Sequence, residues 1–219
     1  MTGVSVLRDL RTGFGDVRDQ GARPTCLAFA ASDAHAAARG DPWGALSAEW
    51  AFYHAVRRDG GDAASGSTLG GMLDALRLDG QPVEACWPYD DGADPDPATW
   101  APPRGSYEVF RRNSRREGAS VGDVVALLDA GRPALLVMTL SDAFYVPDGE
   151  GIVAAAEPPD PARVHALVAV GHGLLMGGGR GLLVRNSWGI EWSVGGHAWI
   201  AEDYLAPRLR ACVAMMEEV

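Results

Sequence analysis

Lysine is absent from this sequence of 219 residues, and all 19 basic residues are arginines. Acidic residues number 29, so the formal net charge is −10 at pH 7. A surface that is acidic on balance repels phosphate groups. We therefore expect neither a nucleic acid nor an anionic membrane as a general partner.

Cysteine is scarce as well. The three cysteines, Cys26, Cys86 and Cys212, are too few for a disulfide scaffold, and their odd number leaves at least one thiol free. No apolar run is long enough to cross a bilayer, and residues 1–13 lack the basic-then-apolar order of a secretory signal. These features predict a cytoplasmic protein, with export by a non-classical route as the alternative.

Close pairs of metal ligands, such as Cys-x-x-Cys, are also missing. We therefore expect no metal and no organic cofactor. One basic run opposes the acidic trend and consists of Arg111, Arg112, Arg115 and Arg116. We interpret this run as a solvated loop, with a docking patch for an acidic partner as the alternative.

The amino-terminal half carries the signals of helices. Residues 24–39 are rich in alanine without internal glycine or proline, which predicts a long helix with Cys26 at its beginning. Residues 47–58 open with a serine cap, and residues 71–80 end at a glycine, so two further helices are expected. Residues 87–103 are dense in proline, aspartate and glycine, which predicts an irregular crossover between two lobes.

The carboxy-terminal half is dominated by strand patterns. The expected strands cover residues 106–112, 133–140, 165–175, 181–189 and 195–201. Residues 121–131 predict one helix that Gly131 stops. We expect a single domain over residues 1–219, with a helical lobe near 12–100 and a β-rich lobe over 101–219 that includes the amino-terminal segment.

Four residues together indicate the chemistry of a thiol hydrolase. Cys26 at a helix start meets unpaired N–H groups and the positive end of the helix dipole, which favour a thiolate. His165 begins an apolar strand and is the expected base. Asn186 ends another strand, where its oxygen would accept from one imidazole nitrogen while the other faces the sulfur. The amide of Gln20, with the N–H of Cys26, would form an oxyanion hole.

Each of these residues alone has an ordinary structural alternative. A cysteine in an alanine-rich helix is usually a small buried side chain, a histidine in a strand usually belongs to the core, and Asn-Ser-Trp-Gly is a plausible tight turn. The order Gln20, Cys26, His165, Asn186 is much harder to explain in that way. Trp188, two residues after the asparagine, would cover the hydrogen bond between Asn186 and His165 and exclude water.

Three segments resemble the papain and cathepsin family of cysteine peptidases. They are residues 19–32 (DQGARPTCLAFAAS), 165–173 (HALVAVGHG) and 186–200 (NSWGIEWSVGGHAWI). His165 follows Cys26 by 139 residues, within the roughly 130–150 typical of the family. The resemblance covers nearly the whole chain. It implies an α+β fold of two lobes, with a long central helix starting at the catalytic cysteine, an antiparallel barrel-like β lobe, and the active-site cleft between them.

The resemblance also implies how a substrate binds. Gly70 and Gly71 match the Gly-Gly wall on which a substrate backbone lies extended, and Leu73 and Ala166 fall where the family builds its main specificity pocket. An apolar side chain two residues before the scissile bond is the implied preference. Trp192 matches the tryptophan on the leaving side. The residues implied to bind substrate are Gly70, Gly71, Leu73, Ala166, Trp188 and Trp192.

The sequence departs from the family at several positions. Arg23 stands where the family has a half-cystine, Leu27 where it has tryptophan, and Thr68 where it often has cysteine. We expect Arg23 to point to solvent, with a pKa-lowering place beside the sulfur as the alternative. Family zymogens carry a long propeptide, and only 19 residues precede Gln20. Restraint by a regulatory partner, an accessory domain or narrow substrate choice is therefore expected, or else a prosegment has been removed.

The sequence thus predicts a cysteine endopeptidase that acts on a dedicated protein or peptide substrate. An acyl transferase is the alternative among enzymes, because the same triad passes an acyl group to whichever nucleophile arrives first. A pseudoenzyme or effector that binds peptides in an inactive cleft is the alternative outside enzymes.

Overall fold

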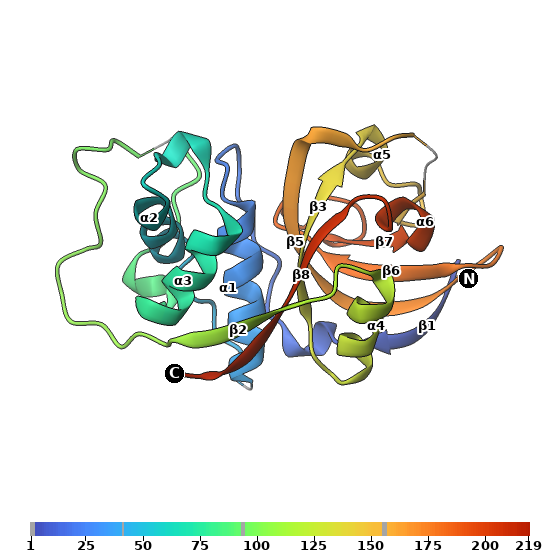
Figure 1. The fold of residues 1–219 in the computed structure, drawn as a ribbon, viewed down its shortest axis with the longest axis horizontal. Coiled ribbons are helices and arrows are strands. Elements are labelled where there is room, and N and C mark those ends of the chain that lie inside the picture. The colour runs from blue at the N-terminus through green and yellow to red at the C-terminus, as the bar shows by residue number, and fades with distance from the viewer. Residues whose placement is uncertain (1–2, 41, 93–94, 155–156) are drawn as a thin grey trace.

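The helices of residues 26–78 gather on one side of the molecule, and a twisted sheet lies on the other side with the remaining helices around it (Figure 1). The computed structural model describes residues 3–40, 42–92, 95–154 and 157–219. Its helices are α1 (Cys26–Arg39), α2 (Ala48–Asp59), α3 (Leu69–Leu78), α4 (Val121–Asp129), α5 (Asp142–Tyr145) and α6 (Glu202–Leu205). Short 3-10 turns are η1 (Arg11–Gly13), η2 (Ala63–Ser65) and η3 (Glu84–Cys86). The expected α+β architecture is confirmed.

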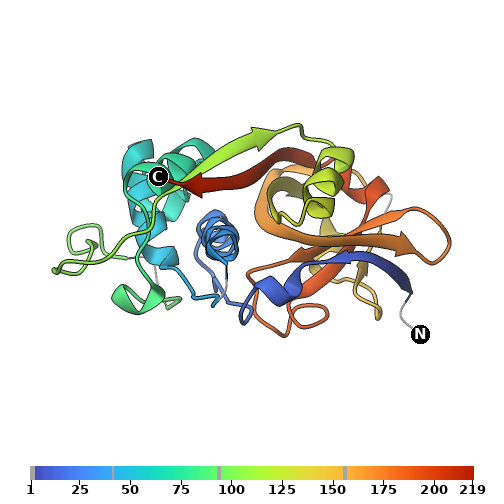
Figure 2. The ribbon, with the colours of Figure 1, turned by 90° about the horizontal axis from the view of Figure 1, so that it is seen from below.

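One largely antiparallel sheet joins the strands. They are β1 (Val4–Asp9), β2 (Arg112–Glu117), β3 (Ala134–Leu140), β4 (Ile152–Val153), β5 (Asp160–Leu175), β6 (Arg180–Arg185), β7 (His197–Ala201) and β8 (Leu209–Glu218). Their order is β2-β8-β3-β5-β6-β7-β4, and β1 pairs with the far end of β5. In the described residues, only the pairing of β4 with β7 is parallel. Figure 2 shows α1 nearly end-on, with α2 and α3 on one side of it and the sheet on the other.

The strand β5 is buried on both faces where it crosses the middle of the sheet. Ala166 and Val168 belong to the core shared with α1, α2 and α3, whereas Leu167 and Ala169 belong to the core beneath α4. This alternation follows from the two-residue period of a strand. Burial on both faces explains why the sequence after His165 is continuously apolar.

The amino-terminal caps of α2 and α3 follow local sequence. The hydroxyl of Ser47 accepts from the N–H of Trp50, as the serine-cap prediction requires. Thr68 caps α3 by accepting from the N–H of Gly71, so this helix begins at Leu69, two residues before its predicted start.

The basic run is not a solvated loop, because residues 112–117 form strand β2. Arg112 is buried and donates to Glu218 and to the carbonyl of Met216 on the paired strand β8. Its long apolar stem packs while its guanidinium finds acceptors. The strand predicted at 106–112 is wrong by several residues; before β2, Phe110 forms only an isolated bridge with Gln81. The sequence patterns also missed β1, β4 and β8.

The crossover expected at 87–103 is irregular in its described part, and residues 93 and 94 lie outside the described residues. Cys212 lies in the core beneath α4. None of the helices in the described ranges combines the length and apolar character that a membrane crossing needs.

Candidate active site

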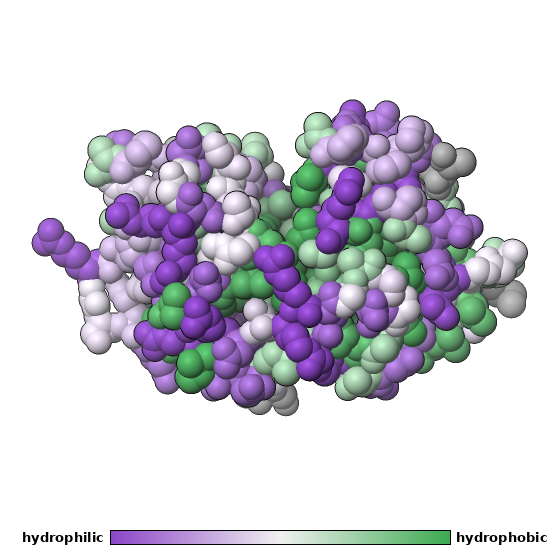
Figure 3. Space-filling model, in the orientation of Figure 1, coloured by the Kyte–Doolittle hydropathy of each residue, from purple (hydrophilic) through white to green (hydrophobic). Residues whose placement is uncertain are grey.

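A cleft of about 510 Å³ lies between the helices and the sheet, where Figure 3 shows the surface hollowed between the two lobes. Its lining comes from the segment before α1, from the first residues of α1, from the turn between η2 and α3, and from β3, β5 and the loop after β6. Of the predicted catalytic residues, Gln20, Cys26 and His165 line this cleft together.

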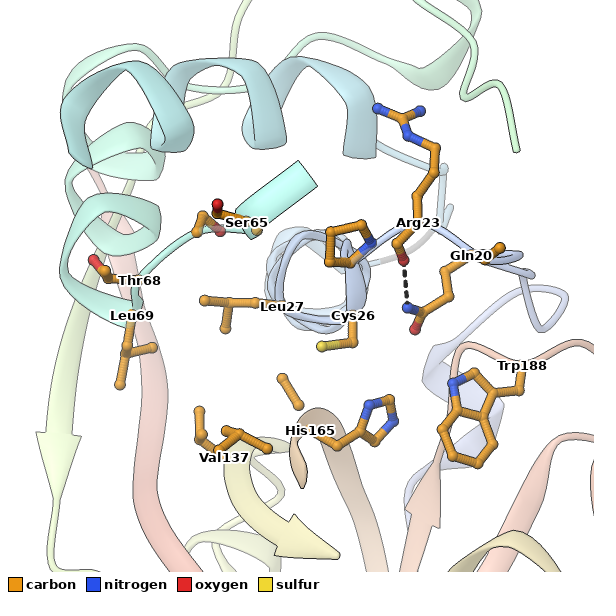
Figure 4. A pocket seen from close by; sticks show the side chains of 16 residues that line it. Gln20, Arg23, Cys26, Leu27, Ser65, Thr68, Leu69, Val137, His165 and Trp188 are labelled. Atoms are coloured by element: carbon orange, nitrogen blue, oxygen red, sulfur yellow. Dashed lines mark hydrogen bonds between the residues drawn. The ribbon is translucent and has the colours of Figure 1, made fainter. Parts of the chain in front are cut away.

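Cys26 is the first residue of α1 and is half-buried (Figure 4). Burial raises the pKa of its thiol, and the backbone N–H groups of Ala166, Leu27 and Cys26 itself oppose that rise. The helix start therefore acts on the sulfur in the expected direction. Burial nevertheless outweighs it, and the net effect is a raised thiol pKa.

His165 is held by Asn186 from the far side of the ring. The Nε2 atom of His165 lies 2.7 Å from Asn186 Oδ1, which also accepts from the N–H of Ser187 at 2.9 Å. Because that oxygen can only accept, Nε2 carries a proton and Nδ1 is the nitrogen left to face the cleft. Burial lowers the pKa of His165 to about 4, against the opposing effect of the Asn186 hydrogen bond.

The two pKa shifts have one cause, which is that a single charge is costly in this cleft. A thiolate alone or an imidazolium alone loses its hydration, whereas the two together compensate each other. Among the described residues no hydrogen bond joins the sulfur of Cys26 to the ring of His165, although both side chains line the cleft (Figure 4).

Aromatic rings cover the histidine. The ring of Trp188 lies 4.7 Å from that of His165, between centroids, as the sequence predicted. The fully buried Phe144 contacts both rings, at 5.8 Å from His165 and 5.4 Å from Trp188. Tyr145 stacks on Trp188 at 5.3 Å and 16°. Sequence reasoning missed α5, which carries Phe144 and Tyr145, because four residues are too few to show a helical period.

Gln20 is fixed at both ends of its side-chain amide. Oε1 accepts from the hydroxyl of Ser187 at 2.7 Å, and Nε2 donates to the carbonyl of Arg23 at 2.9 Å, the dashed line in Figure 4. An amide nitrogen has two protons, so one remains for a ligand in the cleft. Ser187 was missed, although its place beside Asn186 in the Asn-Ser-Trp-Gly block was the available signal.

Comparison with known proteins extends these observations. No family model matches the chain. A cysteine protease from Blomia tropicalis is 26% identical over 98 residues, which make up 45% of this chain and only 29% of that relative.

Solved structures match over almost the whole chain. Xylellain, a cysteine protease from Xylella fastidiosa, superposes with a TM-score of 0.75 and 21% identity over 96% of this chain and 86% of its own. The digestive procathepsin L 3 of Tenebrio molitor larval midgut superposes with a TM-score of 0.77 and 16% identity, over 96% of this chain and 69% of its own. A structure from work on antibody cross reactivity between the mite allergens Blo t 1 and Der p 1 superposes with a TM-score of 0.73 and 20% identity, over 99% of this chain and 71% of its own.

The chain has the papain-like fold. Within that fold the glycine wall is not where the sequence suggested, because Gly70 and Gly71 lie in the first turn of α3 and do not line the cleft. A Cβ on Gly71 would clash with the carboxylate of Asp59, the last residue of α2, so this glycine lets α2 and α3 approach each other. The cleft wall is instead residues 65–69, in which Gly66 has a φ of +79°.

The other residues implied to bind substrate divide between the cleft and the core of this papain-like fold. Ala166 and Trp188 line the cleft. Leu73 does not; it packs against the core of the helical lobe. Trp192 is also away from the cleft lining and is 9% exposed, with its ring 5.7 Å from that of Trp188. Leu69, Val137 and Val164 supply the apolar lining that the sequence had not indicated.

Arg23 does not point to solvent, and it does not lie against the sulfur. It is 4% exposed and forms an ion pair with Glu49. Its guanidinium extends away from Cys26 in Figure 4. Both sequence-based alternatives for this residue are wrong, because a buried acceptor on α2 was not visible from the local sequence.

The remaining histidines have partners outside the cleft. Nε2 of His172 lies 2.7 Å from Asp129 Oδ1, and Nδ1 of His197 lies 2.9 Å from the carbonyl of Gly195. In the part of the chain that the structure describes, no group of three or more histidine, cysteine, aspartate or glutamate side chains is placed to hold a metal ion.

Proposed function

We propose that this protein is a cysteine endopeptidase with Cys26 as nucleophile, His165 as base and Asn186 as the group that orients the base. The observation that carries the proposal is the 2.7 Å contact of His165 Nε2 with Asn186 Oδ1, in a cleft that Cys26 enters from a helix start. The cysteine proteases named among its relatives and structural neighbours support the same activity.

The proposed reaction begins with transfer of the thiol proton of Cys26 to Nδ1 of His165. The sulfur attacks the peptide carbonyl, a C–S bond forms, and the π electrons move to the oxygen. The oxyanion accepts from the free amide proton of Gln20 and from the N–H of Cys26, each worth roughly 3 kcal/mol by analogy with other acyl-transfer sites. The imidazolium then gives its proton to the leaving amine as the C–N bond breaks.

Water completes the cycle. His165 takes a proton from a water molecule, which attacks the thioester, and the thiol is restored when the acid product leaves. Asn186 keeps the ring aligned through both proton transfers. Its neutrality matters, because a carboxylate there would favour the imidazolium and delay its return of the proton.

The proposed substrate is an extended segment of a dedicated protein or peptide. Leu69, Val137, Val164 and Ala166 form an apolar part of the cleft, which suits an apolar side chain near the scissile bond. We also propose that residues 1–219 form a single catalytic domain and that a regulatory partner restrains it. A cytoplasmic location is proposed as well, which the three free thiols suit.

The test is hydrolysis of a quenched-fluorescence peptide library by the wild-type chain and by its Cys26→Ser variant, with products identified by mass. We expect internal cleavage by the wild type only, favouring peptides with an apolar residue near the cut. Adding an amine acceptor at millimolar concentration checks the acyl-transfer alternative, since products that carry the amine in preference to water would contradict a hydrolase. Absence of any cleavage, together with alkylation of Cys26 at the rate of free cysteine, would remove the proposal.

A further inference from the structure

We propose that Arg23 is a positioning residue for the oxyanion donor, acting through a buried ion pair with Glu49 that holds the segment from Gln20 to Cys26 in place. The inference rests on the proposed function, because it assigns a cause to the placement of Gln20. Arg23 would not touch the substrate's reacting atoms. Its effect would pass through Gln20.

The ion pair is buried and two-pronged. Nη1 of Arg23 donates to Glu49 Oε2 at 2.7 Å, and Nη2 donates to Glu49 Oε1 at 2.9 Å. The side chains of Arg23 and Glu49 are 3% and 4% exposed. Such parallel hydrogen bonds fix direction as well as distance. The segment before α1 is thereby attached to the first turn of α2, which carries Glu49.

Three further contacts extend this attachment to the crossover segment. Nη1 of Arg23 also donates to the carbonyl of Asp90 at 2.6 Å. The indole N–H of Trp100 donates to Glu49 Oε1 at 2.7 Å. The guanidinium lies 4.7 Å from the ring centroid of Tyr89. Polar groups buried this deeply need partners, and here each contact also restrains a different stretch of chain.

The backbone of Arg23 connects this network to the oxyanion hole. Its carbonyl accepts from Gln20 Nε2 at 2.9 Å and from the N–H of Thr25 at 2.8 Å. That carbonyl therefore decides which way one amide proton of Gln20 points, and hence where the other is offered to the cleft. A displacement of Arg23 would turn the amide even while Ser187 still held its oxygen.

Tyr89 restrains the same segment through a second set of contacts. The hydroxyl of Tyr89 donates to the carbonyl of Gln20 at 2.7 Å and lies 2.8 Å from the hydroxyl of Thr25. Tyr89 thus contacts the guanidinium through its ring and the Gln20 backbone through its oxygen. At the position where the resembled family has a half-cystine, this chain has a noncovalent brace that no change of redox state can open.

The test compares two reagents that differ in their need for the oxyanion hole. A peptide aldehyde adds reversibly to the thiol, forming a C–S bond while its carbonyl oxygen gains negative charge or a proton in the oxyanion hole. Iodoacetamide alkylates the sulfur and expels iodide, without forming an oxyanion at carbon. We expect Arg23→Met to weaken aldehyde inhibition by about tenfold or more, close to the effect of Gln20→Ala, while the alkylation rate changes less than twofold.

A double-variant cycle identifies the route of the effect. If Arg23 acts through Gln20, adding Arg23→Met to Gln20→Ala should change the aldehyde inhibition constant less than twofold further. If the double variant lost aldehyde affinity by the product of the two single losses, the proposal would be overturned. Unchanged aldehyde inhibition in the Arg23→Met single variant would overturn it as well. If Gln20→Ala itself leaves aldehyde inhibition unchanged, the proposed oxyanion hole fails first, and the two failures are thereby distinguished.

Matched variants separate positioning from folding. Arg112 is a second buried arginine that donates to a glutamate, away from the cleft, so Arg112→Met should lower the melting temperature without changing aldehyde inhibition. Should Arg23→Met fail to fold, Trp100→Phe removes the indole bond to Glu49 while keeping an aromatic ring against Phe52 and Tyr53, and should give a smaller loss in the same direction. Unchanged inhibition in a folded Trp100→Phe protein would then count against the brace.

Discussion

The two sides of the cleft hold their functional side chains by different means. On the helical side, buried charges fix the chain: Arg23 pairs with Glu49, and Arg18 pairs with Asp33 at 2.7 Å. On the sheet side, His165 is held by a neutral amide and by the rings of Phe144 and Trp188.

The difference follows from what each side has to do. The segment before Cys26 must keep one geometry, and a paired, buried guanidinium does that without changing its charge. In the proposed reaction His165 gains and loses a proton, and a fixed carboxylate behind its ring would bias that exchange. A neutral hydrogen bond with aromatic cover keeps the ring in place and leaves its charge free to change.

The largest effect on peptide cleavage is expected from removing either reacting group, one on each side of the cleft. Cys26→Ala and His165→Ala should each lower the rate of peptide cleavage by about 10⁴-fold or more, because attack needs both the sulfur and its base. Cys26→Ala should keep the wild-type melting temperature within a few degrees, since alanine suits the start of the helix. Substantial turnover in either folded variant would contradict the assigned roles.

Changing Asn186 tests whether neutrality matters. Asn186→Ala should lower turnover by about 10–100-fold, because the buried N–H of His165 loses its acceptor, a cost of about 1–3 kcal/mol. Asn186→Asp should raise the pKa of His165 from about 4, the value that burial gives it in the wild type. The Cys26 thiolate would then form at lower pH, paired with the imidazolium, so alkylation should extend to lower pH than in the wild type while turnover falls.

The measurement is the pH profile of iodoacetamide alkylation beside that of peptide cleavage. Equal profiles for Asn186→Asp and wild type would show that the neutral amide is dispensable. The matched control is Asn113→Asp on β2, which introduces the same charge away from the cleft and should leave both profiles unchanged.

Phe144→Leu tests the aromatic cover. The smaller side chain loses ring contacts with His165 and Trp188, so turnover should fall by a few-fold and unfolding should cost about 1–3 kcal/mol less. Val124→Ala in α4, also fully buried, should cost similar stability without the loss of turnover. Urea denaturation and cleavage rate, measured together, check both statements. A Val124→Ala protein as slow as Phe144→Leu would assign the effect to general loosening.

Much of this arrangement was predictable, because the signals were local. The helix starting at Cys26 and the strand containing His165 follow from composition and period, and Asn186 lies at the predicted strand end. The wall of the cleft was misplaced because a Gly-Gly pair also suits close packing of helices, which is what Gly71 does against Asp59. The partner of Arg23 was not predictable, because Glu49 is brought to it only by the fold.

A histidine on the helical side offers the smallest expected change in turnover. His35 is fully buried in α1, and its Nδ1 lies 3.0 Å from Gln81 Oε1. Burial lowers its pKa to about 4, against the opposing Gln81 hydrogen bond, and Arg112 and Arg39 add to the lowering. The folded state therefore binds this proton less readily than the unfolded chain does. The neutral form contributes stability that is present above about pH 6.5 and is lost as the pH falls toward 4.

His35→Gln should accordingly flatten the decline of unfolding free energy between pH 6.5 and 4.5, by up to about 3 kcal/mol, and leave peptide cleavage at neutral pH unchanged. Urea denaturation at three pH values in that window measures the slope. Burial also lowers the pKa of His165, so comparing the two histidines separates one that only titrates from one that we propose also takes part in the reaction. If His35→Gln kept the wild-type slope, burial of this ring would not be a source of the acid sensitivity.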